Sequence, residues 1–174
     1  GLMVVGVTRF GFAFGSGTLV APPGATKEQA LRYVEEQKKS FLPLLEAMKR
    51  HSALLAYDIG DENIWAGDNL AAFAAVAHWV RETDPHHPVW ANQAPQQSIA
   101  LFKRWYRFVD IGGADIYPWW NGQRPDSHSD LPNKTIAVVG DECRKNMEAL
   151  GPRKPVFMTL QSFGWSDGQK ENVY

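Results

Sequence analysis

Apolar residues are arranged along this chain in two alternating patterns. Short runs of consecutive apolar residues, many of them β-branched, are typical of strands that are buried on both faces. Between them lie longer stretches with apolar residues at every third or fourth position, which is the spacing of one face of an α-helix. The runs predict five strands, at residues 2–8, 53–59, 88–92, 109–117 and 155–161. The periodic stretches predict four intervening helices, with the third at 96–108 and the fourth at 134–150.

The first predicted helix carries a start signal and an interruption. Thr26 is followed three residues later by Gln29, which is the spacing of a capping box. An apolar stripe continues as far as Met48. Pro43 lies inside the stripe, and a proline has no N–H to donate within a helix. We therefore expect either a kink at Pro43 or two successive helices.

Strict alternation of strands and helices predicts an α/β fold in which a parallel sheet is covered by helices. A doubly wound open sheet and a (β/α)8 TIM barrel both fit this order. Eight units of about 35 to 40 residues would give a barrel of ordinary size. The loops that follow strands are long and the turns that follow helices are short, which favours a barrel with its site on those loops. We predict a partial (β/α)8 barrel, with residues 1–174 forming one incomplete domain that lacks units at both ends.

Composition removes several classes of function. Lys plus Arg number 18 and Asp plus Glu number 19, so the net charge is -1, which disfavours a nucleic-acid partner. The single cysteine, Cys143, excludes an intrachain disulfide and any multi-cysteine metal site. The apolar runs are too short to cross a membrane. No phosphate-binding loop or other cofactor motif is present, so we expect no cofactor and no metal.

The two ends of the chain bear on how it would behave alone. It begins at Gly1, ends at Tyr174 within a polar stretch, and shows no leader pattern before the first strand. We expect that the ends were processed or that the chain is a piece of a longer protein. Five strands of a barrel would leave unpaired edges and an exposed apolar lining. We therefore expect residues 1–174 to be poorly soluble or loosely packed when they are expressed alone.

The segment at residues 51–94 contains the most informative motifs, ALLAYDIGDEN and DPHHPVWAN. It resembles the fourth and fifth strands of the retaining (β/α)8-barrel glycoside hydrolases of clan A, which include β-galactosidases, β-mannanases and cellulases. VDIGGADIYP resembles their sixth strand and KPVFMTLQSFGW their seventh, so the chain would hold about strands three to seven. The resemblance implies hydrolysis of O-glycosidic bonds in an oligo- or polysaccharide. It also makes an extracellular or periplasmic location plausible.

By this resemblance Glu62 falls at the end of strand four, where the family keeps its general acid/base. Departure of the leaving group requires a carboxylic acid close to the glycosidic oxygen, with a raised pKa. The alternative is a carboxylate in a solvated loop or at a helix cap. Asp61 is expected to be structural. Asn63 departs from the family, whose common versions place Asn before the Glu or Pro after it.

A second departure lies at strand seven, where retaining enzymes carry a nucleophilic Glu and this chain has Gln161. Three explanations stay open. The second carboxylate could come from elsewhere, with Asp115 or a part outside the chain as candidates. The reaction could be inverting, with a more distant base. The barrel could instead be a catalytically degenerate carbohydrate binder without turnover. In an active glycosidase the predicted catalytic-site residues are Glu62, Tyr117, which would orient a carboxyl group or the substrate, and Gln161, which would hydrogen-bond sugar near the reacting centre.

Seven tryptophans are an unusually large number for 174 residues, and indole faces pack well on sugars. Four of them follow predicted strand ends, where a barrel builds its site, and the other three are expected in the core. The predicted substrate-binding residues are Asn63, Trp65, Asn92, Asp115, Trp119, Trp120 and Trp165, and the predicted core tryptophans are Trp79, Trp90 and Trp105. His86 and His87 lie in a turn on the opposite side, so we do not expect them to bind metal.

Overall fold

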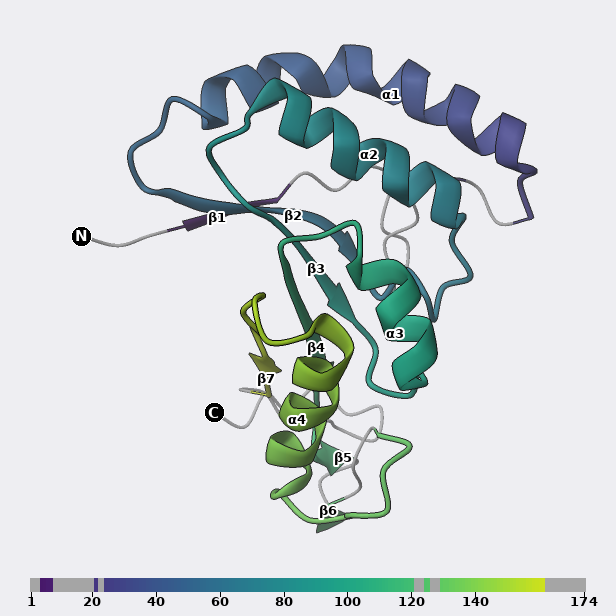
Figure 1. The fold of residues 1–174 in the computed structure, drawn as a ribbon, viewed down its shortest axis with the longest axis vertical. Helices are drawn as coiled ribbons and strands as arrows, with labels where there is room; N and C mark the ends of the chain where they lie inside the picture. The colour runs from purple at the N-terminus through teal and green to yellow at the C-terminus, as the bar shows by residue number, and fades with distance from the viewer. Residues whose placement is uncertain (1–3, 8–20, 22–23, 121–123, 126–128, 162–174) are drawn as a thin grey trace, which may run out of the picture.

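The computed structural model describes residues 4–7, 21, 24–120, 124–125 and 129–161. Strands and helices alternate along it, and a short hairpin is inserted after the fourth strand (Figure 1). The strands are β1 (Val4–Val7), β2 (Leu54–Asp61), β3 (Val89–Gln93), β4 (Ile111–Ile116), β5 (Trp119–Trp120), β6 (Arg124–Pro125) and β7 (Thr159–Leu160). The helices are α1 (Lys27–Met48), α2 (Leu70–Thr83), α3 (Ile99–Tyr106) and α4 (Val138–Leu150).

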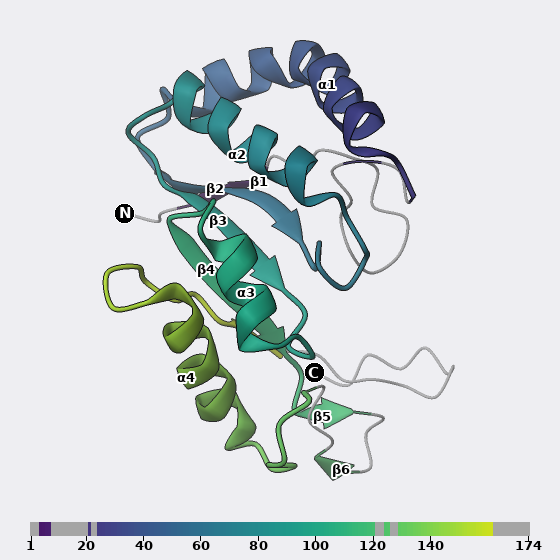
Figure 2. The same cartoon turned by 45° about the vertical axis from the view of Figure 1, so that its right-hand side comes forward.

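The main sheet has the strand order β1-β2-β3-β4-β7, and every neighbouring pair is parallel. Strand order therefore follows chain order, whereas a doubly wound sheet reverses its order at a switch point. The sheet is curled, and the helices lie along one side of it (Figure 2). The prediction of an α/β fold with parallel strands is confirmed, and the described strands form a half-barrel that is consistent with part of a (β/α)8 barrel.

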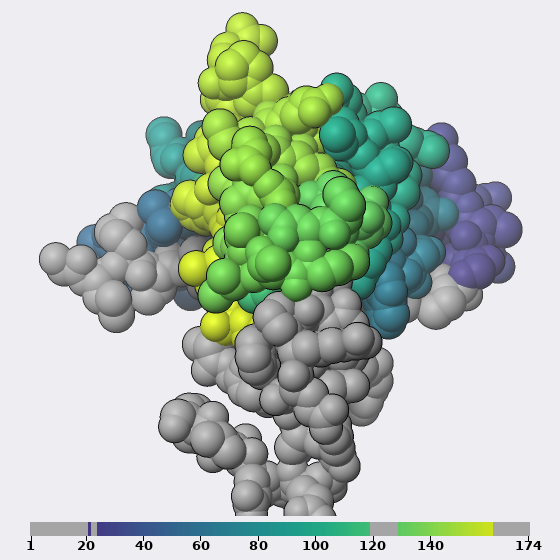
Figure 3. All heavy atoms as spheres, turned by 90° about the horizontal axis from the view of Figure 1, so that it is seen from below, coloured from purple at the N-terminus to yellow at the C-terminus, as the bar shows by residue number. Residues whose placement is uncertain are grey.

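The apolar core lies between the sheet and the helices. Tyr57 and Ile59 of β2 pack there with Phe73 of α2 and Phe102 of α3, all at most 1% exposed. Helices α3 and α4 pack against each other, and their surfaces adjoin in the view from below (Figure 3). Trp105 is buried in this core as predicted, whereas Trp79 and Trp90 are half-buried. In the part of the chain that the structure describes, no helix is both long enough and apolar enough to cross a membrane.

Local hydrogen bonds explain where the helices begin. The capping box predicted at Thr26 is confirmed, with Gln29 N donating to Thr26 Oγ1 at 3.2 Å and Thr26 N to Gln29 Oε1 at 2.9 Å. Helix α1 continues through Pro43, so of the two alternatives, a kink or two successive helices, the second is wrong. Val34 and Leu45, on either side of Pro43, are both buried, and this packing favours one helix over two. Helix α3 begins later than predicted because Ser98 caps it.

The last predicted strand is much shorter in the structure. Only Thr159–Leu160 pairs as a strand, while Val156 forms an isolated bridge to Gly112 of β4. A Cβ atom at Gly113 would stand 1.6 Å from the carbonyl oxygen of Phe157, so the two backbones are in direct contact there. Glycine is required at position 113 by this close approach. The loop predicted at 118–132 also differs, because it contains the antiparallel pair β5 and β6.

Candidate active site

A bulge at the end of β2 sets the direction of the side chains that follow it. In the pairing with β3, Asp58 is opposite Trp90 and Asp61 is opposite Asn92, so three steps on one strand match two on the other. An extra residue of this kind bends a strand and re-aims its side chains. The backbone N–H of Gly60, within the bulge, donates to Asp58 Oδ1 at 3.1 Å.

Glu62 follows the bulge and begins a tight turn. It has a positive φ of 50°, a left-handed conformation that costs a residue with a Cβ atom about 1 kcal/mol or more. The turn is closed internally, since Ala66 N donates to the Glu62 carbonyl at 2.9 Å and Asp68 N to the Asn63 carbonyl at 2.9 Å. It is also fastened to β3, because Glu62 N donates to the Asn92 carbonyl at 3.0 Å.

The side chain of Glu62 meets that of Asp115, which lies near the end of β4. The two carboxyl groups are hydrogen-bonded, and the residues are 7% and 3% exposed. Tyr117 donates a hydrogen bond to Asp115 as well. The carboxyl ends of parallel strands share one edge of a sheet, which is why residues 53 positions apart in the sequence come together here.

Burial and mutual repulsion shift the pKa values of this group. Burial, the charge of Asp115, its hydrogen bond and then the charge of Asp61 raise the pKa of Glu62 to about 8. Burial also raises the pKa of Asp115, while hydrogen bonds from Glu62 and Tyr117 work in the opposite direction. The pKa of Tyr117 rises because of burial and the charge of Asp115. Two carboxyl groups in contact cannot both ionise cheaply, so the pair holds one proton near neutral pH.

A second chain of hydrogen bonds crosses the same edge of the sheet. Thr159 Oγ1 of β7 donates to Asn92 Oδ1 at 3.3 Å, and Asn92 Nδ2 donates to Asp61 Oδ1 at 2.9 Å. This contact agrees with the structural role expected of Asp61. Asn92 is predicted to bind sugar hydroxyls, but it is buried and both of its amide atoms are engaged with protein groups. These two hydrogen bonds connect β2 with β7 through Asn92.

The remaining predicted site residues differ in exposure. Asn63 is fully buried in the turn, where its Nδ2 donates to Asp68 Oδ2 at 3.1 Å. Trp65 is 52% exposed, as a residue that contacts substrate would be. Gln161 is half-buried and directly follows β7. Trp119 and Trp120 form β5, which lies beyond the end of β4, and Trp165 is outside the described residues.

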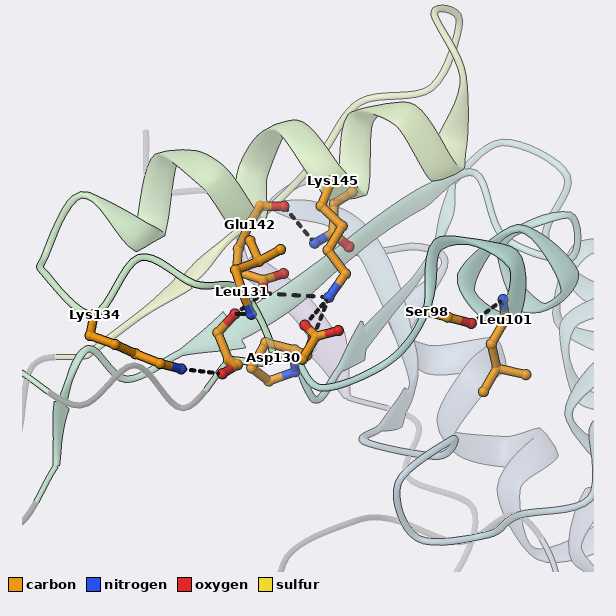
Figure 4. A network of polar contacts seen from close by, with 10 residues as sticks. Ser98, Leu101, Asp130, Leu131, Lys134, Glu142 and Lys145 are labelled. Carbon is orange, nitrogen blue, oxygen red and sulfur yellow. Dashed lines mark hydrogen bonds and ion pairs between the residues drawn. The ribbon is translucent and has the colours of Figure 1, made fainter.

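Sequence reasoning missed several residues that hold the neighbouring loops. Lys145 of α4 is buried and donates to the Pro95 carbonyl at 2.6 Å and to Asp130 at 2.5 Å (Figure 4). Glu142 lies beside Lys145 and accepts a hydrogen bond from Ser129. This network joins the loop after β3 to the loop before α4. The only signal in the sequence is two charged residues on a helix, a pattern that usually marks a solvated face.

Gln93, the last residue of β3, was also missed. It is fully buried, and its Oε1 accepts a hydrogen bond from Ile64 N at 3.1 Å. A polar residue at a strand end is the one sequence signal that could have found it. Within the described residues, no group of three His, Cys, Asp or Glu side chains is arranged to hold a metal ion.

Neither a protein-family model nor a curated protein matches the chain. Solved structures resemble it in fold. One is a β-D-glucuronidase of Dictyoglomus thermophilum, with a TM-score of 0.51 and 17% identity over 85% of this chain and 23% of that chain. Another is a GH2 β-galacturonidase from Eisenbergiella tayi bound to galacturonate, with a TM-score of 0.44 and 16% identity over 77% of this chain and 21% of that chain. The chain thus spans less than a quarter of the length of these structures.

Proposed function

We propose that the chain is the part of a glycoside hydrolase barrel that supplies the general acid, and that it acts on O-glycosidic bonds of an oligo- or polysaccharide. The observation that carries this proposal is the buried pair of Glu62 and Asp115 at the carboxyl ends of β2 and β4. The half-barrel fold supports it, as does the likeness in fold to a β-D-glucuronidase. Barrel enzymes carry their catalytic residues at the carboxyl ends of the strands, which supports this assignment.

Glu62 is suited to give a proton to the leaving glycosidic oxygen. With a pKa near 8 it keeps its proton at neutral pH, and an acid whose pKa lies near the working pH is the most effective. The bond between the sugar carbon and the oxygen breaks as the proton passes from the Glu62 carboxyl to that oxygen, and the sugar carbon bonds to water, either directly or after a nucleophile outside this pair has held the sugar. Asp115 holds Glu62 in the protonated form, and Tyr117 steadies the charge on Asp115 by donating a hydrogen bond.

Asp115 is not suited to act as the nucleophile opposite Glu62. A retaining enzyme needs about 5 Å between its two carboxyl groups, and an inverting enzyme needs more. A hydrogen-bonded pair is closer than either, so no sugar ring fits between the two groups. We therefore assign Asp115 the role of proton partner. The base or nucleophile would come from a residue other than these two.

Hydrolysis assays on the full chain with a panel of chromogenic glycosides and polysaccharides test this function. We expect Glu62→Gln to lower kcat by about 10²- to 10⁴-fold, the usual contribution of a general acid. Glu36→Gln, the same change at an exposed position of α1, is the control and should leave the rate unchanged. If the chain hydrolyses a glycoside and Glu62→Gln retains the wild-type rate, Glu62 is not the acid.

A second candidate function is glycan binding without turnover. The observation that favours it is Gln161, an amide directly after β7, where the resemblance implies a nucleophilic carboxylate. This candidate predicts saturable binding of an oligosaccharide, quenching of tryptophan fluorescence and no release of product. Binding that is saturable and accompanied by hydrolysis would exclude it.

A further inference from the structure

Gln93 has no part in the proposed chemistry, yet it contacts the turn that carries the acid. We propose that Gln93 is a positioning residue, which holds the Glu62 turn against the end of β3 and so keeps the Glu62 carboxyl group on Asp115. This inference rests on the proposed function only in calling Glu62 the acid. The anchoring itself depends on the contacts of the turn and can be tested without any substrate.

Gln93 lies on the strand between the two strands whose ends carry the carboxyl groups. It is the last residue of β3, which pairs with β2 on one side and with β4 on the other. Its partner across the sheet is Ala114, the residue before Asp115. Gln93 is 0% exposed, so its side chain is held within the protein and does not reach into solvent.

The turn is fastened to β3 at two points that bracket Asn63. Glu62 N donates to the Asn92 carbonyl at 3.0 Å, and Ile64 N donates to Gln93 Oε1 at 3.1 Å. The first bond joins backbone groups and would form with any side chains. The second exists only because residue 93 offers an acceptor at that reach. Together the two bonds fix the Asp61–Glu62 and Asn63–Ile64 peptide units and support the left-handed backbone of Glu62.

The other end of the Gln93 amide strengthens this interpretation. Its Nε2 is buried and has no hydrogen-bond partner among the described residues. Burying an unpaired donor is unfavourable, and an apolar side chain of similar size would avoid it. A buried glutamine therefore costs stability at this position, and the one benefit it brings is the acceptor Oε1. The group that uses this acceptor is Ile64 N.

Loss of the anchor should change the surroundings of Glu62. The ionisable groups that affect it are Asp115 and Asp61, and the Tyr117 hydroxyl is bound to Asp115. When the turn is free to move, Glu62 can leave Asp115 and become hydrated. Both changes favour its charged form, so its titration midpoint should fall from about 8 toward that of an ordinary glutamate.

Carboxyl ¹³C NMR titration of the full chain measures this midpoint, and hydrogen exchange measures the protection of the Ile64 amide. We expect Gln93→Met to lower the Glu62 midpoint by at least one pH unit and to speed Ile64 exchange at least tenfold. Gln93→Glu still offers a carboxyl oxygen as acceptor, so it should preserve the protection of the Ile64 amide. The matched control is Gln96→Met, the same substitution at an exposed residue three positions on, and it should change neither.

The inference is overturned if Gln93→Met frees the Ile64 amide while the Glu62 midpoint stays near 8. If Gln93→Met does not fold, Gln93→Asn replaces it, because the shorter amide is polar but cannot reach Ile64 N. An unchanged Ile64 protection in Gln93→Asn would equally overturn the inference. These results are separate from the activity assays, since a Glu62→Gln variant with full activity would refute the proposed function and leave the anchor untouched.

Discussion

The two ends of the same sheet treat carboxylates in opposite ways. At the amino ends of the strands, Asp84 accepts hydrogen bonds from the Tyr57 hydroxyl at 2.7 Å and from His86 N at 2.9 Å, and it contacts His87 Nδ1 at 2.7 Å. Burial raises the pKa of Asp84, but these hydrogen bonds outweigh it, and the net pKa is lowered. Asp110 is held similarly, by both Arg81 and the backbone of Val89.

At the carboxyl ends, carboxyl groups face one another instead of facing cations. Glu62 and Asp115 are hydrogen-bonded to each other, and Asp61 adds a third carboxyl group. Asp115 Oδ1 is buried without a hydrogen-bond partner among the described residues. The carboxylates at the amino ends of the strands stabilise the fold, whereas those at the carboxyl ends lower its stability. Sites that depart from local stability rules in this way are candidates for function.

The largest expected effect on stability comes from a substitution at the amino ends of the strands. Asp84→Ala leaves the Tyr57 hydroxyl and the His87 ring without their buried partner, so the free energy of unfolding should fall by about 3 kcal/mol. Urea denaturation at pH 7 measures this, with Glu82→Gln at an exposed position as the control. The contribution of Asp84 should be lost as the pH falls through its lowered folded pKa, because protonation then favours the unfolded chain. A loss below 1 kcal/mol would contradict the assignment.

The second prediction is a gain in stability, and it concerns the carboxyl ends of the strands. The folded pKa of Glu62 is raised, so the folded state binds the extra proton and loses stability as the pH rises from about 4 to about 8. Glu62→Gln removes this penalty and should stabilise the chain by on the order of 2 kcal/mol at pH 8, with little change at pH 4. Urea denaturation of both proteins across this pH range decides it. A gain that does not depend on pH would show that ionisation of Glu62 is not its cause.

The third prediction sharpens the difference through the pH dependence of the proposed activity. Asp115→Asn removes the negative charge beside Glu62 and should lower the pKa of Glu62, so less of the acid is protonated at neutral pH. We expect kcat/KM to fall about tenfold at pH 7 and to recover at lower pH, equivalent to about 1.4 kcal/mol. The pH–rate profile is the measurement. A uniform loss at every pH would point to a structural role for Asp115.

The smallest effect concerns a partly exposed ion pair at the amino end. Arg81 binds Asp110 through two nitrogens at 3.0 and 3.2 Å, and both side chains are about a third or more exposed. Arg81→Met should reduce the free energy of unfolding by about 0.5 kcal/mol, and high salt should shrink the difference. Denaturation at two salt concentrations checks this. A loss as large as that of Asp84→Ala would remove the distinction between buried and exposed partners.

The main elements were predictable because each has its own periodicity. Strand β2 and helix α2 follow from apolar runs and stripes that any arrangement of the fold would keep. Boundaries were less accurate, since caps such as Ser98 decide where a helix begins. Of the two alternatives predicted at Pro43, a kink or two successive helices, the second is wrong because packing of the helix outweighed the lost hydrogen bond.

The sequence pointed to the two carboxyl residues of the candidate site but not to the contact between them. Glu62 and Asp115 were both identified, yet their hydrogen bond depends on strand register and on the bulge between Asp58 and Asp61. Neither leaves a periodic signal in the sequence. Gln93 was missed for the same reason, because only the folded chain brings its amide to the Ile64 backbone.

The strand order also has a consequence for folding. Each strand of the main sheet pairs with the one before it, across a single intervening helix or, for β7, across a hairpin and a helix. The sheet can therefore assemble in the order in which the chain is synthesised, each new strand adding to an edge that already exists. In that sequence Glu62 leaves the ribosome before β3 and β4, so its carboxyl group stays hydrated until Asp115 arrives. Glu62 is thus desolvated only after the fourth strand is added.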